Sequence, residues 1–381
     1  MSYYEKTRQR FNYFQIPDSE HFAPNTYRQE LASLTTSLGE AVTGIAGVAV
    51  LSPVLEVKVA AALVLLEICD SYCALLKRSG ELGVRISDRA IRDPVGETSG
   101  SWMGLEEMSA SIIQPALEMI RKIVSSGIRV AEWRTIRLLE RKCIPNLVFS
   151  EEIIDSLRHL PIDTRRMKSM GARDGRYSVF RNTREYDEAP LGEAGPEQTR
   201  EVFKQAWIQR DELDAIETFA RVVAAELLDM QTLKDLSQIV ADEGRHCMAG
   251  ELMLAALGAN PFDVPVGVIG SEIRRSMSPW DALSQICLVG ETSNLRNILQ
   301  SALLARGSPL LVCEALLTSI YLDERSHIAI GTHTLQTKFP AVATKTLQEQ
   351  ALSSTRDYLV QHNAVQRPPS SAAEMGRFIG E

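Results

Sequence analysis

The string Asp-Glu-x-x-His occurs twice in the sequence, each time behind an apolar run, in LSQIVADEGRHCMAG and in LTSIYLDERSHIAIG. The two copies contribute Asp242, Glu243, His246, Asp323, Glu324 and His327. Residues three apart share one face of an α-helix, so the Glu and the His of each copy can point at one spot. Burying these groups in an apolar core is costly unless they bind something, and a metal ion is the usual ligand. The repeat therefore predicts a metal site built from two helices.

Such a site needs further carboxylates at the same height on neighbouring helices. The upstream candidates are Glu212, Glu217, Glu226 and Glu291. Thr232 with Asp235 is typical of a helix start, which places the turn of the first hairpin near 229–232. Glu217 then comes level with Glu243, whereas Glu212 would miss by roughly 9 Å at about 1.5 Å per residue. We therefore expect Glu217 to supply the third carboxylate.

The second hairpin is expected to break at 306–309, in LLARGSPLL. Glu291 lies fifteen residues before Arg306, and Glu324 lies fifteen residues after Pro309, so these two carboxylates also come level. The predicted metal ligands are Glu217, Glu243, His246, Glu291, Glu324 and His327. Oxygen donors with one nitrogen per metal suit iron or manganese, whereas zinc prefers fewer ligands and calcium does not favour His.

The composition of the 381 residues bounds the class of protein. Apolar residues make up 45% and charged residues 24%, as in ordinary globular proteins, and the net charge of −8 argues against nucleic-acid binding. The six cysteines form no C-x-x-C pair and indicate reduced, buried thiols. The longest uncharged apolar stretch, 41–55, is too short to span a bilayer. We therefore predict a cytoplasmic protein that binds neither nucleic acid nor a membrane.

Apolar residues recur at helical spacing almost throughout the chain. The predicted helices are roughly 26–50, 54–78, 103–140, 150–159, 199–229, 233–257, 279–305, 309–336 and 340–361. Residues 161–198 are expected to form an irregular connection, and the tail after about 363 to be loosely held. The predicted organisation is an N-terminal helical region over 1–200, a di-metal bundle over 201–340, and a C-terminal helix and tail over 341–381.

Over about 205–335 the chain resembles the ferritin-like non-heme di-iron carboxylate proteins, and AIETFARVVAAELLDMQTLKDLSQIVADEGRH resembles an uncharacterised bacterial ferritin-like family. The Asp-Glu-x-x-His form is most similar to the oxygen-activating branch, which holds ribonucleotide reductase small subunits, hydroxylases and arylamine N-oxygenases. The resemblance implies an all-α fold, a ferritin-like four-helix bundle, here with additional N-terminal helices.

The resemblance also implies a role for each residue of the site. Glu243 and Glu324 would bridge two Fe ions, or an Mn/Fe pair, as the catalytic carboxylates. The remaining ligands would pair as Glu217 with His246 and Glu291 with His327. Asp242 and Asp323 would each hold the second ring nitrogen of the other half's histidine, which fixes the tautomer and raises ligand basicity.

Departures from the family refine this expectation. Reductase small subunits carry a radical Tyr one turn beyond the first Glu-x-x-His, where this chain has Gly250, and Gly331 stands at the equivalent point of the second half. We therefore expect no stored tyrosyl radical, and the glycines would either leave room for a substrate or allow close helix packing. Ile320 replaces the extra ligand His of arylamine N-oxygenases, so the substrate class of that subgroup is not carried over.

Two basic features lie outside the ligand set. Arg221, one turn after Glu217, is a further catalytic candidate. It could hold a substrate carboxylate, neutralise the four carboxylates of the site, or lie at the surface or beside the ligands. The irregular connection carries Arg165, Arg166, Lys168, Arg173, Arg176, Arg181 and Arg184. These could form a lid, dock an acidic carrier protein or electron donor, or simply lie in solvent.

The expected activity is that of an O2-dependent di-iron oxygenase which hydroxylates or N-oxygenates a small organic substrate, free or bound to a carrier, in specialised metabolism. An external electron donor, a ferredoxin or a flavoprotein reductase, would restore the reduced metals, and we also consider a homodimer. The alternative is a ferroxidase or metal-handling protein without an organic substrate. A third interpretation is a partner-binding helical protein with a degenerate site.

Overall fold

The computed structural model describes residues 24–96, 102–125, 133–160, 167–181, 197–306 and 310–361. Over these residues the protein is all-α, as the sequence predicts, apart from one pair of very short strands. The strands β1 (Val179–Phe180) and β2 (Val266–Gly267) run parallel, with Val179 opposite Val266. The tail after 363 lies outside the described residues.

Fourteen α-helices lie within the described residues. They are α2 (Pro24–Leu51), α3 (Leu55–Glu81), α4 (Leu105–Met108), α5 (Gln114–Ser125), α6 (Trp133–Leu138), α7 (Ile144–Ser156), α8 (Glu197–Arg210), α9 (Leu213–Ala225), α10 (Met230–Ala256), α11 (Ile269–Arg275), α12 (Pro279–Gln285), α13 (Glu291–Ala305), α14 (Leu311–Lys338) and α15 (Thr344–Gln361). Turns of π-helix join α4 to α5 (η1, Ser109–Ile113), α6 to α7 (η3, Leu139–Cys143) and α12 to α13 (η7, Ile286–Gly290). Short 3₁₀ turns follow α7 (η4, Leu157–His159) and α10 (η6, Pro261–Asp263).

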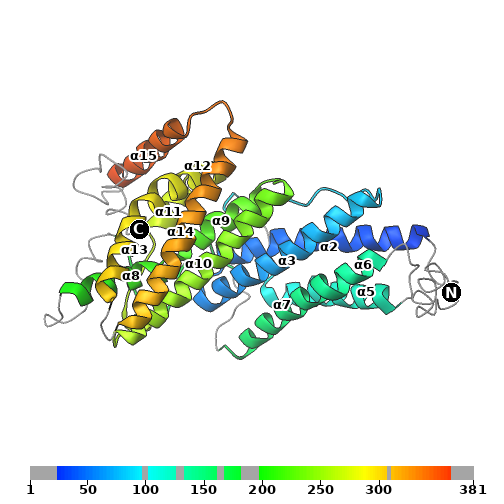
Figure 1. Cartoon of the computed structure of the whole chain (residues 1–381), viewed down its shortest axis with the longest axis horizontal. Helices are drawn as coiled ribbons and strands as arrows, with labels where there is room; N and C mark the ends of the chain where they lie inside the picture. Colours follow the sequence, from blue (N-terminus) through cyan, green and yellow to red (C-terminus); the bar gives the residue numbers. More distant parts are fainter. Residues whose placement is uncertain are drawn as a thin grey trace, which may run out of the picture.

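The long helices form two adjoining four-helix arrangements that share α10 (Figure 1). In one, α8, α10, α13 and α14 pack around the two Asp-Glu-x-x-His strings. In the other, α2 and α3 pack against α9 and α10. Helices α5, α6 and α7 lie on the outer side of α2 and α3. The N-terminal helices thus support α10 from the face opposite α14.

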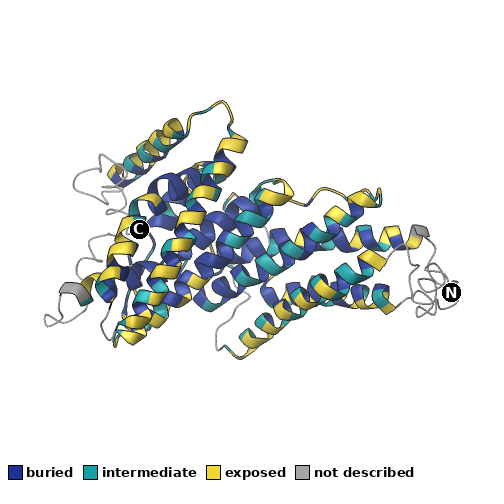
Figure 2. Ribbon diagram, viewed as in Figure 1, coloured by how far each residue is buried: buried dark blue, intermediate teal, exposed yellow. Residues whose placement is uncertain are grey.

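Helices α2 and α3 are rich in Ala, Val and Leu, and by length and composition both could cross a membrane. In the structure 78% of the most apolar window of α2 and 67% of that of α3 are buried inside the protein, as expected for core helices (Figure 2). Close packing follows from small side chains, since a Cβ on Gly244 of α10 would lie 3.2 Å from the Cβ of Ala62 on α3. The absence of a membrane partner stays a prediction.

The first hairpin turns earlier than the sequence suggests. Asp229 caps α10 by accepting hydrogen bonds from the backbone N–H groups of Gln231 and Thr232, so the helix begins at Met230. The connection between α9 and α10 is extended from Glu226. The predicted cap at Thr232 is therefore wrong by three residues, with consequences for the choice of metal ligands.

Within the predicted irregular connection, residues 167–181 are described and carry only β1 and turns. This segment lies against α2, because the backbone N–H of Lys168 donates to the carbonyl of Leu51. The six cysteines are free and buried, in line with the expected reduced thiols. The predicted boundaries of the three regions stay predictions.

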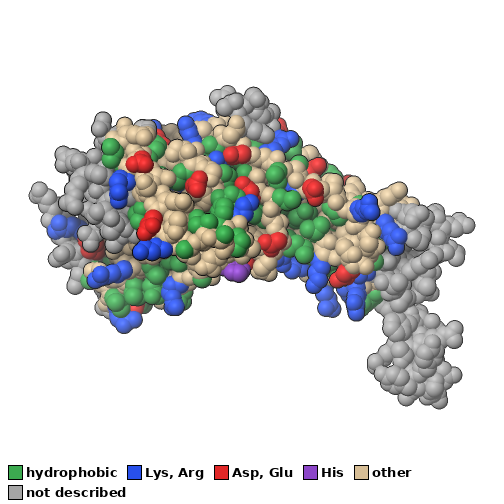
Figure 3. All heavy atoms as spheres, turned by 90° about the horizontal axis from the view of Figure 1, so that it is seen from above, with side chains coloured by type: hydrophobic (Ala, Val, Ile, Leu, Met, Phe, Trp, Pro, Cys, Tyr) green, Lys and Arg blue, Asp and Glu red, His purple; other side chains and the backbone are tan. Residues whose placement is uncertain are grey.

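The surface mixes charges of both signs. In the view of Figure 3, acidic and basic side chains are interspersed with apolar ones over the middle of the face. Such a surface gives no support to binding of a long polyanion on this face.

Candidate metal centre

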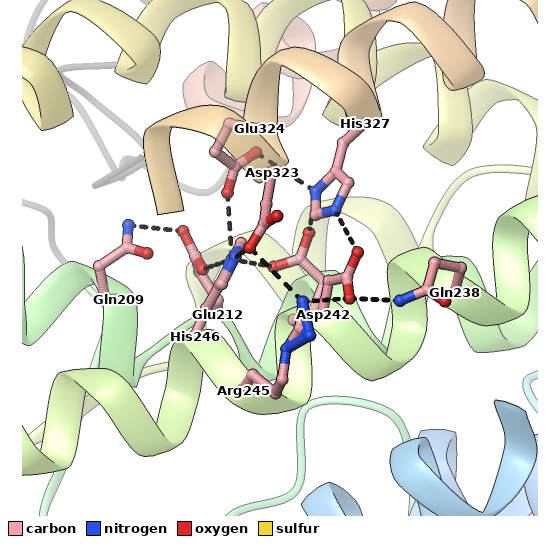
Figure 4. A network of polar contacts seen from close by, with 10 residues as sticks. Gln209, Glu212, Gln238, Asp242, Arg245, His246, Asp323, Glu324 and His327 are labelled. Atoms are coloured by element: carbon pink, nitrogen blue, oxygen red, sulfur yellow. Dashed lines mark hydrogen bonds and ion pairs between the residues drawn. The ribbon is translucent and has the colours of Figure 1, made fainter. Parts of the chain in front are cut away.

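The two Asp-Glu-x-x-His strings lie on α10 and α14, which pack side by side with their polar residues facing one another (Figure 4). Glu243, His246, Glu324 and His327 are almost completely buried, and each residue is at most 2% exposed. Residues three apart on each helix point to the same place, as the helical repeat requires. The predicted convergence of the two strings is therefore observed.

Two overlapping groups of side chains could each hold a metal ion. The first group is Glu212, Glu243, His246 and Glu324, and the second is Glu243, Glu291, Glu324 and His327. Within each group one ligand atom per residue lies within 4.8 Å of the others. Glu243 and Glu324 belong to both groups, so these carboxylates would be shared if each group held an ion.

Both imidazoles turn Nδ1 toward the carboxylates. Nδ1 of His246 lies 3.0 Å from Glu212 and 3.2 Å from Glu243. Nδ1 of His327 lies 3.0 Å from Glu243. The two rings are 5.6 Å apart between centroids. Each of the two groups of side chains therefore contains one histidine Nδ1 atom.

The opposite ring nitrogens meet the two aspartates crosswise. Nε2 of His246 lies 3.4 Å from Asp323 Oδ2, and Nε2 of His327 lies 3.3 Å from Asp242 Oδ2. Each aspartate thus contacts the histidine of the other string, as the resemblance implied. A carboxylate on Nε2 leaves Nδ1 free to face a metal ion.

Three polar side chains that the sequence analysis did not single out hold this arrangement in place. Gln209 donates to Glu212 at 2.8 Å, and Gln238 donates to Asp242 at 2.6 Å. Arg245 donates to Asp242 and lies 3.5 Å from Asp323, so one guanidinium spans both aspartates. The only sequence signal was position: Gln238 and Arg245 lie within about one turn of Asp242.

The structure brings Glu212, and not the predicted Glu217, beside Glu243, His246 and Glu324. Helix α10 begins at Met230, and Glu243 lies thirteen residues after it. Helix α9 ends at Ala225, so the residue level with Glu243 lies thirteen residues before Ala225. That residue is Glu212. A turn at Asp211 and Glu212 also divides the predicted helix 199–229 into α8 and α9, which places Glu212 at the junction.

Glu217 instead lies in a separate buried charge cluster. Its Oε1 is 2.8 Å from Lys58 Nζ and 2.8 Å from the guanidinium of Arg173, while Ser271 donates to Oε2. The contacts with Arg173 and Lys58 outweigh burial and lower the pKa of Glu217. Its role is to join α3, the 167–181 segment and α9.

Arg221 does not reach the metal centre either. Its guanidinium binds Asp93 at 3.0 Å and donates to the carbonyls of Arg274 and Met277. It therefore fastens α9 to the segment around Asp93 and to the C-terminal end of α11.

The described members of the basic run are mostly paired. Arg173 is buried against Glu217, Arg176 binds Glu56 and Asp174, and Arg181 binds Glu272. Arg165, Arg166 and Arg184 lie outside the described residues. The described part of the connection therefore forms ion pairs with α3, α9 and α11.

The glycine four residues after each histidine allows close helix packing rather than leaving space. A Cβ on Gly250 would lie 2.2 Å from the backbone N of Arg210, and a Cβ on Gly331 would lie 2.2 Å from Cys287 Sγ. Arg210 is two residues before Glu212, and Cys287 is four residues before Glu291. In both halves the glycine lets the neighbouring helix bring its carboxylate to the centre.

The π-turn η7 ends one residue before Glu291. One inserted residue rotates the succeeding part of a helix by roughly 100°, since a helix has about 3.6 residues per turn. The side chain of Thr292 donates to the carbonyl of Cys287 at 2.8 Å and supports this widened turn. The face on which Glu291 lies is therefore set by η7, and the predicted choice of Glu291 agrees with the geometry.

Burial and mutual repulsion dominate the electrostatics of the centre. Burial, together with the neighbouring carboxylates, raises the pKa values of Glu212 and Glu291 well above their usual range. Burial acts in the same direction on Glu324, but contacts with His246 and His327 outweigh it and lower its pKa to about 2. The carboxylate contacts likewise outweigh burial and raise the pKa values of both histidines. A cation would relieve the repulsion.

The donor atoms fit a pair of metal ions. Both carboxylate oxygens of Glu291 are buried without a hydrogen-bond partner among the described residues. The oxygens of Glu243 and Oε2 of Glu324 are also buried, and they meet only the histidine rings, at 3.0–3.5 Å and without hydrogen-bond geometry. Such atoms are rare in protein cores unless an ion or water satisfies them. Four carboxylates and two imidazoles, with two carboxylates shared, suit iron or manganese. The protein therefore has a buried Glu/His cluster that could bind metal.

No protein-family model, curated protein or solved structure matches the chain. Functional inference therefore starts from the geometry of this cluster.

Proposed function

We propose that the protein is a ferritin-like di-iron carboxylate protein of the oxygen-activating branch, which hydroxylates or N-oxygenates a small organic substrate, free or carrier-bound, in specialised metabolism. The supporting observation is the sharing of Glu243 and Glu324 between two groups that each contain one histidine. Two reduced iron ions, or an Mn/Fe pair, would supply the electrons and Lewis acidity for reaction with O2.

The chain would contribute the ligands, their orientation and a dry environment. Glu212 with His246 would complete one side, and Glu291 with His327 the other. Asp323 and Asp242 would hold the Nε2 protons, so that each Nδ1 presents a lone pair to the centre. Phe219 lies edge-on to His327 with centroids 6.5 Å apart, and the buried Ile320 lies one turn before Glu324. Such apolar walls exclude water and strengthen electrostatic interactions within the centre.

The partners are also part of the proposal. The reaction with O2 consumes electrons, so an external ferredoxin or flavoprotein reductase would restore the reduced metals. A cytoplasmic location agrees with the free, buried cysteines.

Tight packing beside the centre favours a second candidate function. Gly250 and Gly331 are packed against neighbouring helices, so neither provides a hollow for a substrate. A ferroxidase or metal-handling protein, which oxidises Fe²⁺ without an organic substrate, needs no such hollow.

Anaerobic titration with Fe²⁺ followed by exposure to O2 tests the proposal. We expect two iron ions per chain by elemental analysis, and consumption of O2 measured with an oxygen electrode. The His246→Ala and His327→Ala variants should each lose about one iron, whereas Glu349→Gln, at an exposed position of α15, should bind both. Wild-type protein that binds no iron at micromolar concentrations would exclude both functions.

Mass spectrometry of cell extracts separates the two candidates. An oxygenase should add the mass of one oxygen atom from ¹⁸O2 to an organic compound when reductant is supplied. A ferroxidase should consume O2 only in proportion to added Fe²⁺ and leave the extract unchanged.

A further inference from the structure

A second polar region lies at the N-terminal end of α10, whereas Glu243 and His246 lie near the middle of this helix. A cleft of about 760 Å³ opens between the C-terminal half of α3, the α6–η3 helix and the first turn of α10. It is lined by Cys73, Ala74, Lys77, Arg78, Glu81, Arg134, Leu138, Lys142, Asp229, Met230, Gln231 and Lys234. Lys234 precedes Glu243 by nine residues, which is roughly 13 Å along a helix. The cleft is therefore distinct from the metal centre.

The lining is strongly cationic although the chain as a whole is acidic. Five of the lining residues are Lys or Arg and two are acidic, whereas the net charge of the chain is −8. Gathering cations in one concave place costs repulsion and concentrates a positive potential there. The composition of the chain does not account for this concentration.

Three of the cations are held in fixed positions. Asp70, beside the cleft, accepts from Lys142 at 2.9 Å and from Lys234 at 2.8 Å. Arg78 donates to Thr135 at 2.7 Å and pairs with Glu81 at 2.8 Å. One carboxylate therefore serves two ammonium groups, and Glu81 is already occupied.

The other two cations form no ion pair within the described chain, although both lie near enough to Glu81 to help lower its pKa. Lys77 and Arg134 are both exposed at the cleft, from α3 and α6. The remaining acid, Asp229, is occupied as the N-cap of α10, where its carboxylate binds two backbone N–H groups and the hydroxyl of Thr232. The cleft therefore carries an excess of positive charge.

We propose that this cleft binds a small molecule that carries a phosphate group. A phosphate offers several oxygens to donors that converge from different sides, and Arg can bind it in a bidentate manner. Ala74, Leu138 and Met230 add apolar surface for the rest of the molecule. The volume lies within the range of about 300–1,000 Å³ that is usual for small-molecule sites. This inference does not depend on the function of the metal centre.

Isothermal titration calorimetry of the full chain at low ionic strength tests it, with inorganic phosphate, pyrophosphate and citrate as probes. We expect saturable binding of phosphate and pyrophosphate at one site and weaker binding of citrate, which carries only carboxylates. The double variant Lys77→Gln/Arg134→Gln should weaken phosphate binding by at least about tenfold, the usual effect of losing charged contacts to an anion. Because both residues are exposed, circular dichroism and thermal unfolding should remain those of the wild type.

The matched control is Lys345→Gln, which removes one exposed cation from α15. It should leave phosphate affinity unchanged. The proposal is overturned if the wild type shows no saturable binding of either phosphate probe, or if the control weakens binding as much as the double variant. Stronger binding of citrate would overturn the assignment to phosphate. Metal content measured before and after titration distinguishes binding in the cleft from extraction of metal.

Discussion

Asp323 on α14 lies 3.4 Å from Nε2 of His246 on α10, and the reverse pair, Asp242 and His327, is 3.3 Å apart. These crossed contacts tie the two helices together at the height of the buried Glu/His cluster. They also place both Nδ1 atoms opposite the carboxylates that the two groups share.

Replacing Asp323 by Asn should weaken metal binding by roughly 10- to 100-fold, the usual effect of losing a carboxylate behind a ligand histidine. The measurement is competition between the protein and a chelator for Co²⁺, monitored by absorption. Asp357→Asn, at an exposed position of α15, is the matched control and should bind like the wild type. Equal affinities for the two variants would show that the contact does not orient His246.

Removing the guanidinium of Arg245 should loosen both aspartates together. It is 47% exposed and bridges Asp242 and Asp323, so Arg245→Ala should fold normally. Arg245 contacts the aspartates and not the histidines. Arg245→Ala should therefore lower metal affinity by less than about tenfold, which is the smallest loss expected when a ligand histidine loses its carboxylate. Arg325→Ala serves as control, since Arg325 is an exposed residue of α14 that lies over Tyr321, and it should leave affinity unchanged.

Glu212 and Glu217 should respond to the same substitution in opposite ways. Glu212→Gln should lower bound iron from two ions to about one with little loss of stability. Glu217→Gln should keep both ions but lower the free energy of unfolding by about 3–5 kcal/mol, because Lys58 and Arg173 would be left as buried charges. Elemental analysis and urea unfolding of the metal-free protein measure the two effects, and loss of iron in Glu217→Gln would contradict the ligand assignment.

The close approach at Gly250 predicts sensitivity to a single methyl group. In Gly250→Ala the new Cβ would meet the backbone of Arg210. Helices α8 and α10 must then move apart, which should lower the free energy of unfolding by about 1–3 kcal/mol. Glu212 would move with α8, and affinity for one of the two ions should fall. Gly80→Ala is the control, because a Cβ there meets nothing within 4 Å and a helical Ala should stabilise by up to about 1 kcal/mol.

The buried amine of Lys58 predicts a pH dependence of stability. Burial, only partly offset by Glu217, lowers its pKa from 10.5 to about 8. Between these values the unfolded chain binds the proton and the folded chain does not, so stability should rise with pH in this window. From about pH 7.5 to about 9.5 the gain is on the order of 2 kcal/mol.

Urea unfolding of the metal-free protein at both pH values measures this gain. Lys58→Met removes the titrating group, so the difference between the two pH values should be smaller by that amount in the variant. A wild type and a variant with the same pH dependence would show that Lys58 keeps its ordinary pKa in the folded protein.

The helical class and most of the centre were accessible from local pattern. Spacing of i and i+3 is enough to place Glu243 beside His246 and Glu324 beside His327, because it depends on the helix alone. The choice of Glu291 also survives, since the second connection lies where its Gly and Pro residues indicate. The choice of Glu217 fails because the connection between α9 and α10 lies earlier in the chain than predicted. The residue that lies level with Glu243 is therefore Glu212 and not Glu217.

The sequence by itself determined that two helices each carry a carboxylate and an imidazole on one face, and that these faces must be buried together. Only the tertiary structure decided between Glu212 and Glu217, and how near Glu212 and Glu291 come to the two histidines. Glu212 and Glu291 lie at irregular points, a turn between α8 and α9 and the π-turn η7, and glycines on the opposing helices set how near they come. Irregular turns and backbone contacts depend on packing between distant segments, which periodicity along the chain does not encode.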